Sequence, residues 1–256
     1  MKALFAAVLA ASLTVPARAM RSAAPLPLNA SRPATPVILD PGHGGDDLGA
    51  VVNGVQEKKI ALAVALKLRD RIQGEMPVAL TRADDNYVTL DDRLVESVDW
   101  NGAVFVSIHL NQVRNKKLNG AVVYSFGAQK RGSWKRRHKH PKVPPMPNPP
   151  RVEAGESAYL AQSLVKTMRE GGFRVEDAKS DYYVLKNPAL PSILVEIGYL
   201  SNPEEAARLS DPAYQDKLAD AMAAAIKTYV SGRSLRAETA SSAPAAAAPP
   251  AAPARL

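Results

Sequence analysis

Short apolar runs alternate along the middle of the chain with longer stretches in which apolar residues recur at helical spacing. The short runs predict strands at residues 37–40, 77–82, 103–109, 120–126, 182–186 and 192–198. The helical spacing predicts helices at residues 57–72, 90–101, 156–171 and 214–230, with a short helix opening at Asn202. Because strands and helices alternate, the pattern predicts an α/β layered fold with a mixed rather than wholly parallel sheet.

The two ends of the chain lack this alternation. Residues 1–19 combine an early lysine, an apolar run and an Ala-Arg-Ala ending, which is typical of a secretory signal peptide. Residues 20–35 are rich in Pro, Ala and Ser and are expected to form a flexible leader. Residues 233–256 are expected to be a disordered Ala/Pro-rich tail. The folded domain is therefore expected to span residues 36–232 of an exported protein of the periplasm or cell wall.

The positive charge of the chain is concentrated in residues 127–151. This segment holds eight basic residues and no acidic one, and the remaining basic and acidic residues balance each other in number. Six prolines between Pro141 and Pro150 favour an exposed loop, so residues 127–155 are interpreted as a basic, Pro-rich insertion. Two interpretations stay open: it binds an anionic wall or membrane surface, or it is a solvated loop. Nucleic acid is not an expected partner, since the protein is exported and the segment has few aromatic residues.

Three of the predicted strands end in residues that bind metals or transfer protons. His43 follows the first strand within the sequence Pro-Gly-His-Gly-Gly, His109 ends the strand at 103–109, and Glu196 follows Ile-Leu-Val. Open α/β sheets place their sites at the carboxyl ends of strands. The other two histidines, His138 and His140, lie in the basic run and are interpreted as surface residues. The chain has no cysteine, so a metal would be held by imidazole and carboxylate groups.

Catalytic zinc usually has three protein ligands of the His/His/carboxylate kind. Glu57 fits the third position because its helix follows the His43 loop, although a glutamate there also complements the helix dipole. The rival carboxylates are Asp40, Asp46 and Asp47. Glu196 is either the proton-transferring base of such a site or the partner in a salt bridge with Arg82 or Arg93.

The chain resembles the amidase-3 family of zinc-dependent N-acetylmuramoyl-L-alanine amidases over roughly residues 37–230. The resemblance rests on an ordered set of motifs: VILDPGHGGDDLGA, EKKIALAVALKL, FVSIHLNQ, GAVVYSF and YYVLKNPALPSILVEIGYLSNPEEA. It implies a single domain with a twisted mixed sheet of about six strands flanked by helices. It also implies that His43, Glu57 and His109 bind one zinc ion per chain and that Glu196 is the catalytic acid/base.

The implied activity is hydrolysis of the amide between N-acetylmuramic acid and the L-alanine of the peptidoglycan stem peptide, by zinc-activated water. Peptidoglycan would then be the partner, and a protein activator stays unidentified. Two alternatives remain open: a zinc peptidase that cuts within the stem peptide, and a non-catalytic cell-wall-binding protein. The sequence has no His-Glu-x-x-His motif, no Gly-x-Ser-x-Gly motif and no P-loop, so other common hydrolase and nucleotide-binding classes are not expected.

Overall fold

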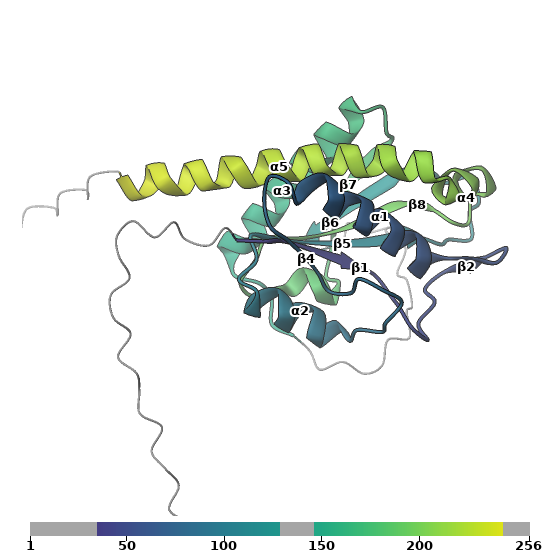
Figure 1. Cartoon of the computed structure of the whole chain (residues 1–256), viewed down its shortest axis with the longest axis horizontal. Coiled ribbons are helices and arrows are strands. Elements are labelled where there is room, and N and C mark those ends of the chain that lie inside the picture. The colour runs from purple at the N-terminus through teal and green to yellow at the C-terminus, as the bar shows by residue number, and fades with distance from the viewer. Residues whose placement is uncertain (1–34, 129–145, 243–256) are drawn as a thin grey trace, which may run out of the picture. The chain divides into compact units, whose positions relative to one another are not determined.

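A six-stranded mixed sheet forms the centre of the fold (Figure 1). The computed structural model describes residues 35–128 and 146–242, so the predicted signal peptide, most of the basic segment and the end of the tail lie outside it. The strands lie in the order β4-β1-β5-β8-β6-β7, and β6 is antiparallel to β8 while the other neighbours are parallel. Their bounds are β1 Val37–Pro41, β4 Val78–Leu80, β5 Val104–Asn111, β6 Ala121–Phe126, β7 Val175–Ser180 and β8 Ser192–Tyr199. The predicted α/β fold with a mixed sheet is confirmed.

Helices cover both faces of this sheet. One face packs against α1 (Glu57–Ile72), α3 (Arg151–Glu170) and α5 (Pro212–Ser242), and the larger apolar core lies between them. The other face carries α2 (Leu90–Asp99) and the short 3₁₀ helix η1 (Tyr183–Lys186) over a smaller core. Figure 1 shows α1 and α5 on one side of the strands and α2 on the other. Each sheet face is therefore buried, as near-continuous apolar strands require.

The central strand β5 shows how the sequence produces the two cores. Val104, Val106 and Ile108 point toward the larger core, whereas Phe105 lies in the smaller one. Successive side chains of a strand leave opposite faces, so this alternation directs the odd positions toward α2. His109 follows the same alternation and leaves the sheet on the face of Phe105. The sequence of β5 thus determines on which side of the sheet the histidine emerges.

Several elements differ from the predictions. Helix α3 begins at Arg151, five residues before its predicted start, so residues 151–155 of the segment interpreted as an insertion are helical. Residues 182–186 were predicted as a strand but form η1, because Tyr182, Val184 and Leu185 all pack into the same core instead of alternating between faces. Strand β7 was missed because its sequence, VEDAKS, is mostly polar, as edge strands often are. Helix α5 continues to Ser242, past the predicted end at Val230, so the tail expected to be disordered is helical over its first part.

Two small elements and one short helix complete the described residues. A two-stranded hairpin, β2 (Val51–Val52) with β3 (Val55–Gln56), leads directly into α1. Helix α4 (Pro203–Ser210) is capped at its N-terminus by Asn202, whose side chain accepts a hydrogen bond from the backbone N–H of Glu205. Among the described residues, none of the helices combines the length and apolar character needed to cross a membrane.

Candidate metal centre

The loop after β1 holds His43 in an unusual backbone conformation. His43 has φ 61°, in the left-handed region that non-glycine residues rarely adopt, and Gly44 and Gly45 also have positive φ. Paired backbone hydrogen bonds between Gly44 and Asp47 close the loop at N···O distances of 2.9 and 3.1 Å. A strained histidine held this firmly is a feature of functional sites.

Asp47 orients the ring of His43. Its carboxylate oxygen Oδ2 lies 2.8 Å from Nδ1 of His43, and its Oδ1 accepts a hydrogen bond from the backbone N–H of Gly49. A carboxylate on one ring nitrogen fixes the tautomer and turns the other nitrogen toward its target. Here Nε2 of His43 lies 3.2 Å from Oε1 of Glu57.

Glu57 is the first residue of α1, and its carboxylate is almost fully buried. Oε2 accepts the backbone N–H of Ala50 at 2.7 Å, and Oε1 accepts that of Leu110 at 2.9 Å. The side chain is 3 % exposed. The residue that precedes the β2–β3 hairpin and the end of β5 therefore both fix the orientation of this carboxylate.

His109 reaches the same point from β5. Its Nδ1 lies 3.0 Å from Oε1 of Glu57, and its ring meets that of His43 edge to face with centroids 4.9 Å apart. Gly42 makes room for the ring, because a Cβ at position 42 would lie 2.2 Å from Cε1 of His109. The glycine before His43 is thus required by close approach of the second histidine.

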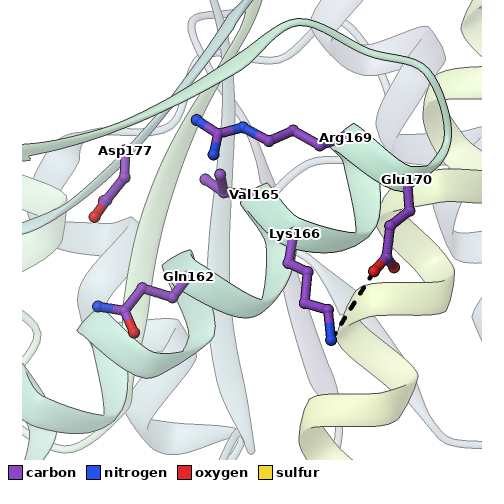
Figure 2. A pocket seen from close by; sticks show the side chains of 6 residues that line it. All are labelled: Gln162, Val165, Lys166, Arg169, Glu170 and Asp177. Atoms are coloured by element: carbon purple, nitrogen blue, oxygen red, sulfur yellow. Dashed lines mark ion pairs between the residues drawn. The ribbon is translucent and has the colours of Figure 1, made fainter.

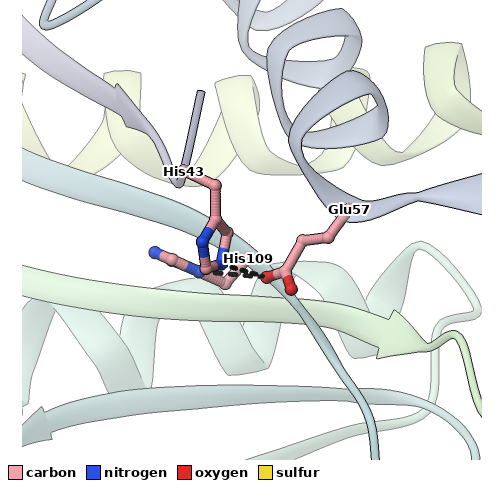
Figure 3. A group of neighbouring side chains, drawn as sticks. All are labelled: His43, Glu57 and His109. Carbon is pink, nitrogen blue, oxygen red and sulfur yellow. Dashed lines mark hydrogen bonds and ion pairs between the residues drawn. The ribbon is translucent and has the colours of Figure 1, made fainter. Parts of the chain in front are cut away.

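The three side chains together form a possible metal site (Figure 3). The nitrogen and oxygen atoms that they offer as ligands all lie within 4.8 Å of one another. The two imidazole side chains are 19 % and 21 % exposed, so one side of the group is open to solvent. Catalytic zinc sites commonly have two imidazoles and one carboxylate as protein ligands and leave one position open for water or substrate. The group formed by these three side chains therefore fits a zinc ion.

The electrostatics of the group favour a cation. Burial acts to lower the pKa of His43, but the Asp47 and Glu57 carboxylates outweigh it and raise that pKa to about 9. Burial acts to raise the pKa of Glu57, but the two imidazoles hold it well below its usual range. Burial lowers the pKa of His109, which keeps this imidazole neutral as a metal ligand must be. Carboxylates that attract a proton to His43 would attract a metal ion in the same way.

Glu196 lies beside this group without belonging to the cluster of three. It is 3 % exposed on β8 and is paired in register with His109 on the neighbouring parallel strand β5. The arginines that were considered as its partners are engaged at the His43 loop. Arg82 donates to the carbonyls of Pro41 and Gly42, and Arg93 bonds to Asp40.

The rival carboxylates of the sequence analysis have other positions. Asp40 is fully buried beneath the loop, where Arg93, Thr81 and Ser107 all donate hydrogen bonds to it. Asp46 is exposed. Asp47 is also exposed, and its carboxylate orients His43. The sequence does contain a signal for this role of Asp47. An acidic residue that follows a histidine by four positions in a tight, glycine-rich loop stays close enough to contact the imidazole ring. His138 and His140 lie outside the described residues.

A surface pocket elsewhere in the fold has no such chemistry. It lies between α3 and β7, and Figure 2 shows Lys166 and Glu170 forming an ion pair at its edge. Its lining mixes acidic, basic and amide side chains: Gln162, Val165, Lys166, Arg169, Glu170 and Asp177. None of these residues belongs to the histidine–glutamate group, and the balanced charges select no class of ligand.

Solved structures share this fold. The catalytic domain of CwlV, an N-acetylmuramoyl-L-alanine amidase from Bacillus (Paenibacillus) polymyxa var. colistinus, aligns with a TM-score of 0.63 and 28 % identity, covering 77 % of this chain and 98 % of that one. The N-acetylmuramoyl-L-alanine amidase AmiC2 of Nostoc punctiforme aligns with a TM-score of 0.62 and 30 % identity, covering 77 % and 97 %. The sheet and its helices therefore match those of known amidases.

Comparison of the amino-acid sequence also shows similarity to N-acetylmuramoyl-L-alanine amidases. The N-acetylmuramoyl-L-alanine amidase AmiA of Escherichia coli (strain K12) is 31 % identical over 218 residues, which cover 75 % of each protein. The family model Amidase_3, described as N-acetylmuramoyl-L-alanine amidase, matches residues 37–228, the span that contains the histidine–glutamate group. This chain therefore belongs to the amidase-3 family of N-acetylmuramoyl-L-alanine amidases, which are peptidoglycan hydrolases.

Proposed function

We propose that this protein cleaves the amide between N-acetylmuramic acid and the L-alanine of the stem peptide, with a single zinc ion held by His43, Glu57 and His109. The observation that carries the proposal is the convergence of these three side chains, within 4.8 Å, at one edge of the sheet of an amidase-3 family member. When bound, zinc supplies a Lewis acid that polarises the amide carbonyl and lowers the pKa of water.

The protein's own groups supply the rest of the chemistry. Asp47 keeps Nε2 of His43 directed into the group, and two backbone N–H groups keep Glu57 oriented. Glu196, beside His109, is proposed to take a proton from the attacking water and to deliver it to the leaving amine nitrogen. Its burial on an apolar strand excludes bulk water from the carboxylate, which suits a group that transfers protons.

The proposed place of action is outside the cytoplasm, in the periplasm or cell wall, where peptidoglycan is found. Export would depend on residues 1–19, whose composition is that of a signal peptide. The basic segment at 127–151 is proposed to hold the enzyme near anionic wall or membrane surfaces, by an attraction that salt would screen.

The proposed cleavage is tested by digesting purified sacculi with the zinc-loaded protein and analysing the products by mass spectrometry. The expected products are complete stem peptides that begin with L-alanine, together with glycan strands whose lactyl groups are free. Shortened stems would instead identify a peptidase. Sacculi that bind the protein but stay intact would identify a wall-binding protein. The matched control is His43→Ala, which removes one proposed ligand and should abolish release of the stem peptides.

A further inference from the structure

Arg82 is a buried arginine that follows β4 and makes four hydrogen bonds, all to backbone carbonyls. Its Nε donates to Pro41 at 2.9 Å, and its Nη1 donates to Asp84 at 2.8 Å. Its Nη2 donates to Gly42 at 2.7 Å and to Lys58 at 2.9 Å. The residue is 4 % exposed, so the positive charge is compensated within the protein rather than by water.

Two of these carbonyls lie next to proposed metal ligands. The carbonyl of Gly42 belongs to the peptide bond that leads into His43, and Lys58 directly follows Glu57. One nitrogen of Arg82 therefore joins the loop that carries the first histidine to the helix turn that carries the carboxylate. His43 needs such support, because its positive φ is costly to maintain.

The third ligand is connected through the same glycine. The backbone N–H of Gly42 donates to the carbonyl of Ile108 at 3.0 Å, and Ile108 directly precedes His109. Hydrogen bonds thus connect the strand segment of His109 to Gly42, and Arg82 connects Gly42 to the first turn of α1.

We infer that Arg82 is a positioning residue for the metal centre, which holds the segments of His43 and Glu57 at the separation that a metal ion requires. This inference rests on the ligand set of the proposed function. Residues that orient metal ligands without touching the metal commonly change metal affinity when they are replaced.

The geometry makes arginine necessary at this position. A guanidinium presents five N–H donors in a fixed plane, and four carbonyls from three segments receive bonds from it here. Lysine has a single nitrogen on a flexible stem, so it can keep the charge but cannot span these carbonyls. Arg93 differs because its partners, Asp40 and the carbonyls of Val88, Pro41 and His43, include none in the first turn of α1.

The test measures zinc affinity by competition with a fluorescent zinc chelator, on the full chain, for the wild type, Arg82→Lys and Arg82→Gln. The matched control is Arg169→Gln, since Arg169 also donates twice to a backbone carbonyl, that of Val175, but at the far edge of the sheet. Thermal melts with and without zinc give the apparent stability of each variant and the increase that zinc produces.

Both Arg82 variants are expected to bind zinc about 10- to 100-fold more weakly and to show a smaller zinc-induced rise in melting temperature. Arg169→Gln is expected to bind zinc within about twofold of the wild type, even if it melts earlier. A folded Arg82→Lys or Arg82→Gln with wild-type zinc affinity would overturn the inference. Loss of a cooperative transition in both Arg82 variants would also overturn it, since the arginine would then serve the fold as a whole. A wild type that binds no zinc would instead overturn the ligand set of the proposed function.

Discussion

His109 and Glu196 are paired across the two central parallel strands, β5 and β8. Paired residues of adjacent strands lie about 4.8 Å apart and leave the sheet on the same face. The pairing therefore places the proposed proton-transferring carboxylate next to a proposed metal ligand without any contribution from a mobile loop. The two roles are separate, because only His109 belongs to the cluster of possible ligands.

Glu196→Gln separates these roles. Glutamine has the shape of glutamate but cannot take up a proton, so turnover should fall by about 10²- to 10⁴-fold while zinc content stays unchanged. Release of stem peptides from sacculi measures the turnover, and elemental analysis measures the zinc. Turnover close to that of the wild type would show that another group transfers the proton.

Gly42→Ala tests whether close packing positions His109. The added Cβ would lie 2.2 Å from Cε1 and 2.4 Å from Nε2 of the His109 ring, so the imidazole cannot keep the position in which it contacts Glu57. The variant should lose most of its bound zinc and its amidase activity. The measurement is zinc per chain after dialysis, with circular dichroism to verify the fold.

Gly74→Ala is the matched control for this substitution. A Cβ at position 74 would meet nothing within 4 Å, and the φ of Gly74 is not in the left-handed region. Zinc content and activity should therefore equal those of the wild type. Equal zinc content in the two alanine variants would contradict the packing argument.

Asp40 should make stability depend on acid pH. Burial acts to raise the pKa of Asp40, but Arg93, together with hydrogen bonds from Ser107 and Thr81, lowers it below its ordinary value of 3.8. A carboxyl whose pKa is lower in the folded state contributes its full stability above the unfolded value. That contribution is lost as the pH falls below 3.8 toward the folded value.

Asp40→Asn measures this contribution. At neutral pH the variant leaves Arg93 without its buried carboxylate, which should cost about 3–5 kcal/mol of unfolding free energy. In urea titrations the difference from the wild type should shrink as the pH falls below about 4. The exposed Asp70→Asn serves as the control and should show a small difference at every pH. A difference between Asp40→Asn and the wild type that does not change with pH would contradict the argument.

Gly155→Ala should stabilise the protein. Gly155 lies within α3, is exposed, and offers open space around a new Cβ. Alanine is favoured over glycine inside a helix by about 0.5–1 kcal/mol, so the urea midpoint should rise. A urea midpoint below that of the wild type would contradict this expectation.

Most of the site could be predicted from sequence because its residues stand where strong local patterns end. His43 lies among glycines after an apolar run, and His109 and Glu196 end or interrupt apolar strands. Glu57 was different: its spacing alone also fitted a helix-dipole interaction, and the family resemblance decided between the two. The structure brings His43, Glu57 and His109 together and places Glu196 on the neighbouring strand, paired with His109.

The supporting residues could not be predicted because their partners are distant in sequence or belong to the backbone. Arg82 donates to carbonyls 24, 40 and 41 residues away, a relation that no local pattern records. Strand β7 was missed since polar edge strands lack the apolar signal. A short apolar run is compatible with either a strand or a helical turn. For this reason the residues of η1 were predicted as a strand.

The most direct test of the proposed function is zinc content and activity after chelation and refilling. Protein treated with a chelator should keep its fold, lose its amidase activity, and regain that activity in proportion to zinc up to one ion per chain. The same treatment of His109→Ala should restore neither zinc nor activity. A folded wild type that takes up no zinc, or that releases stem peptides without it, would contradict the account.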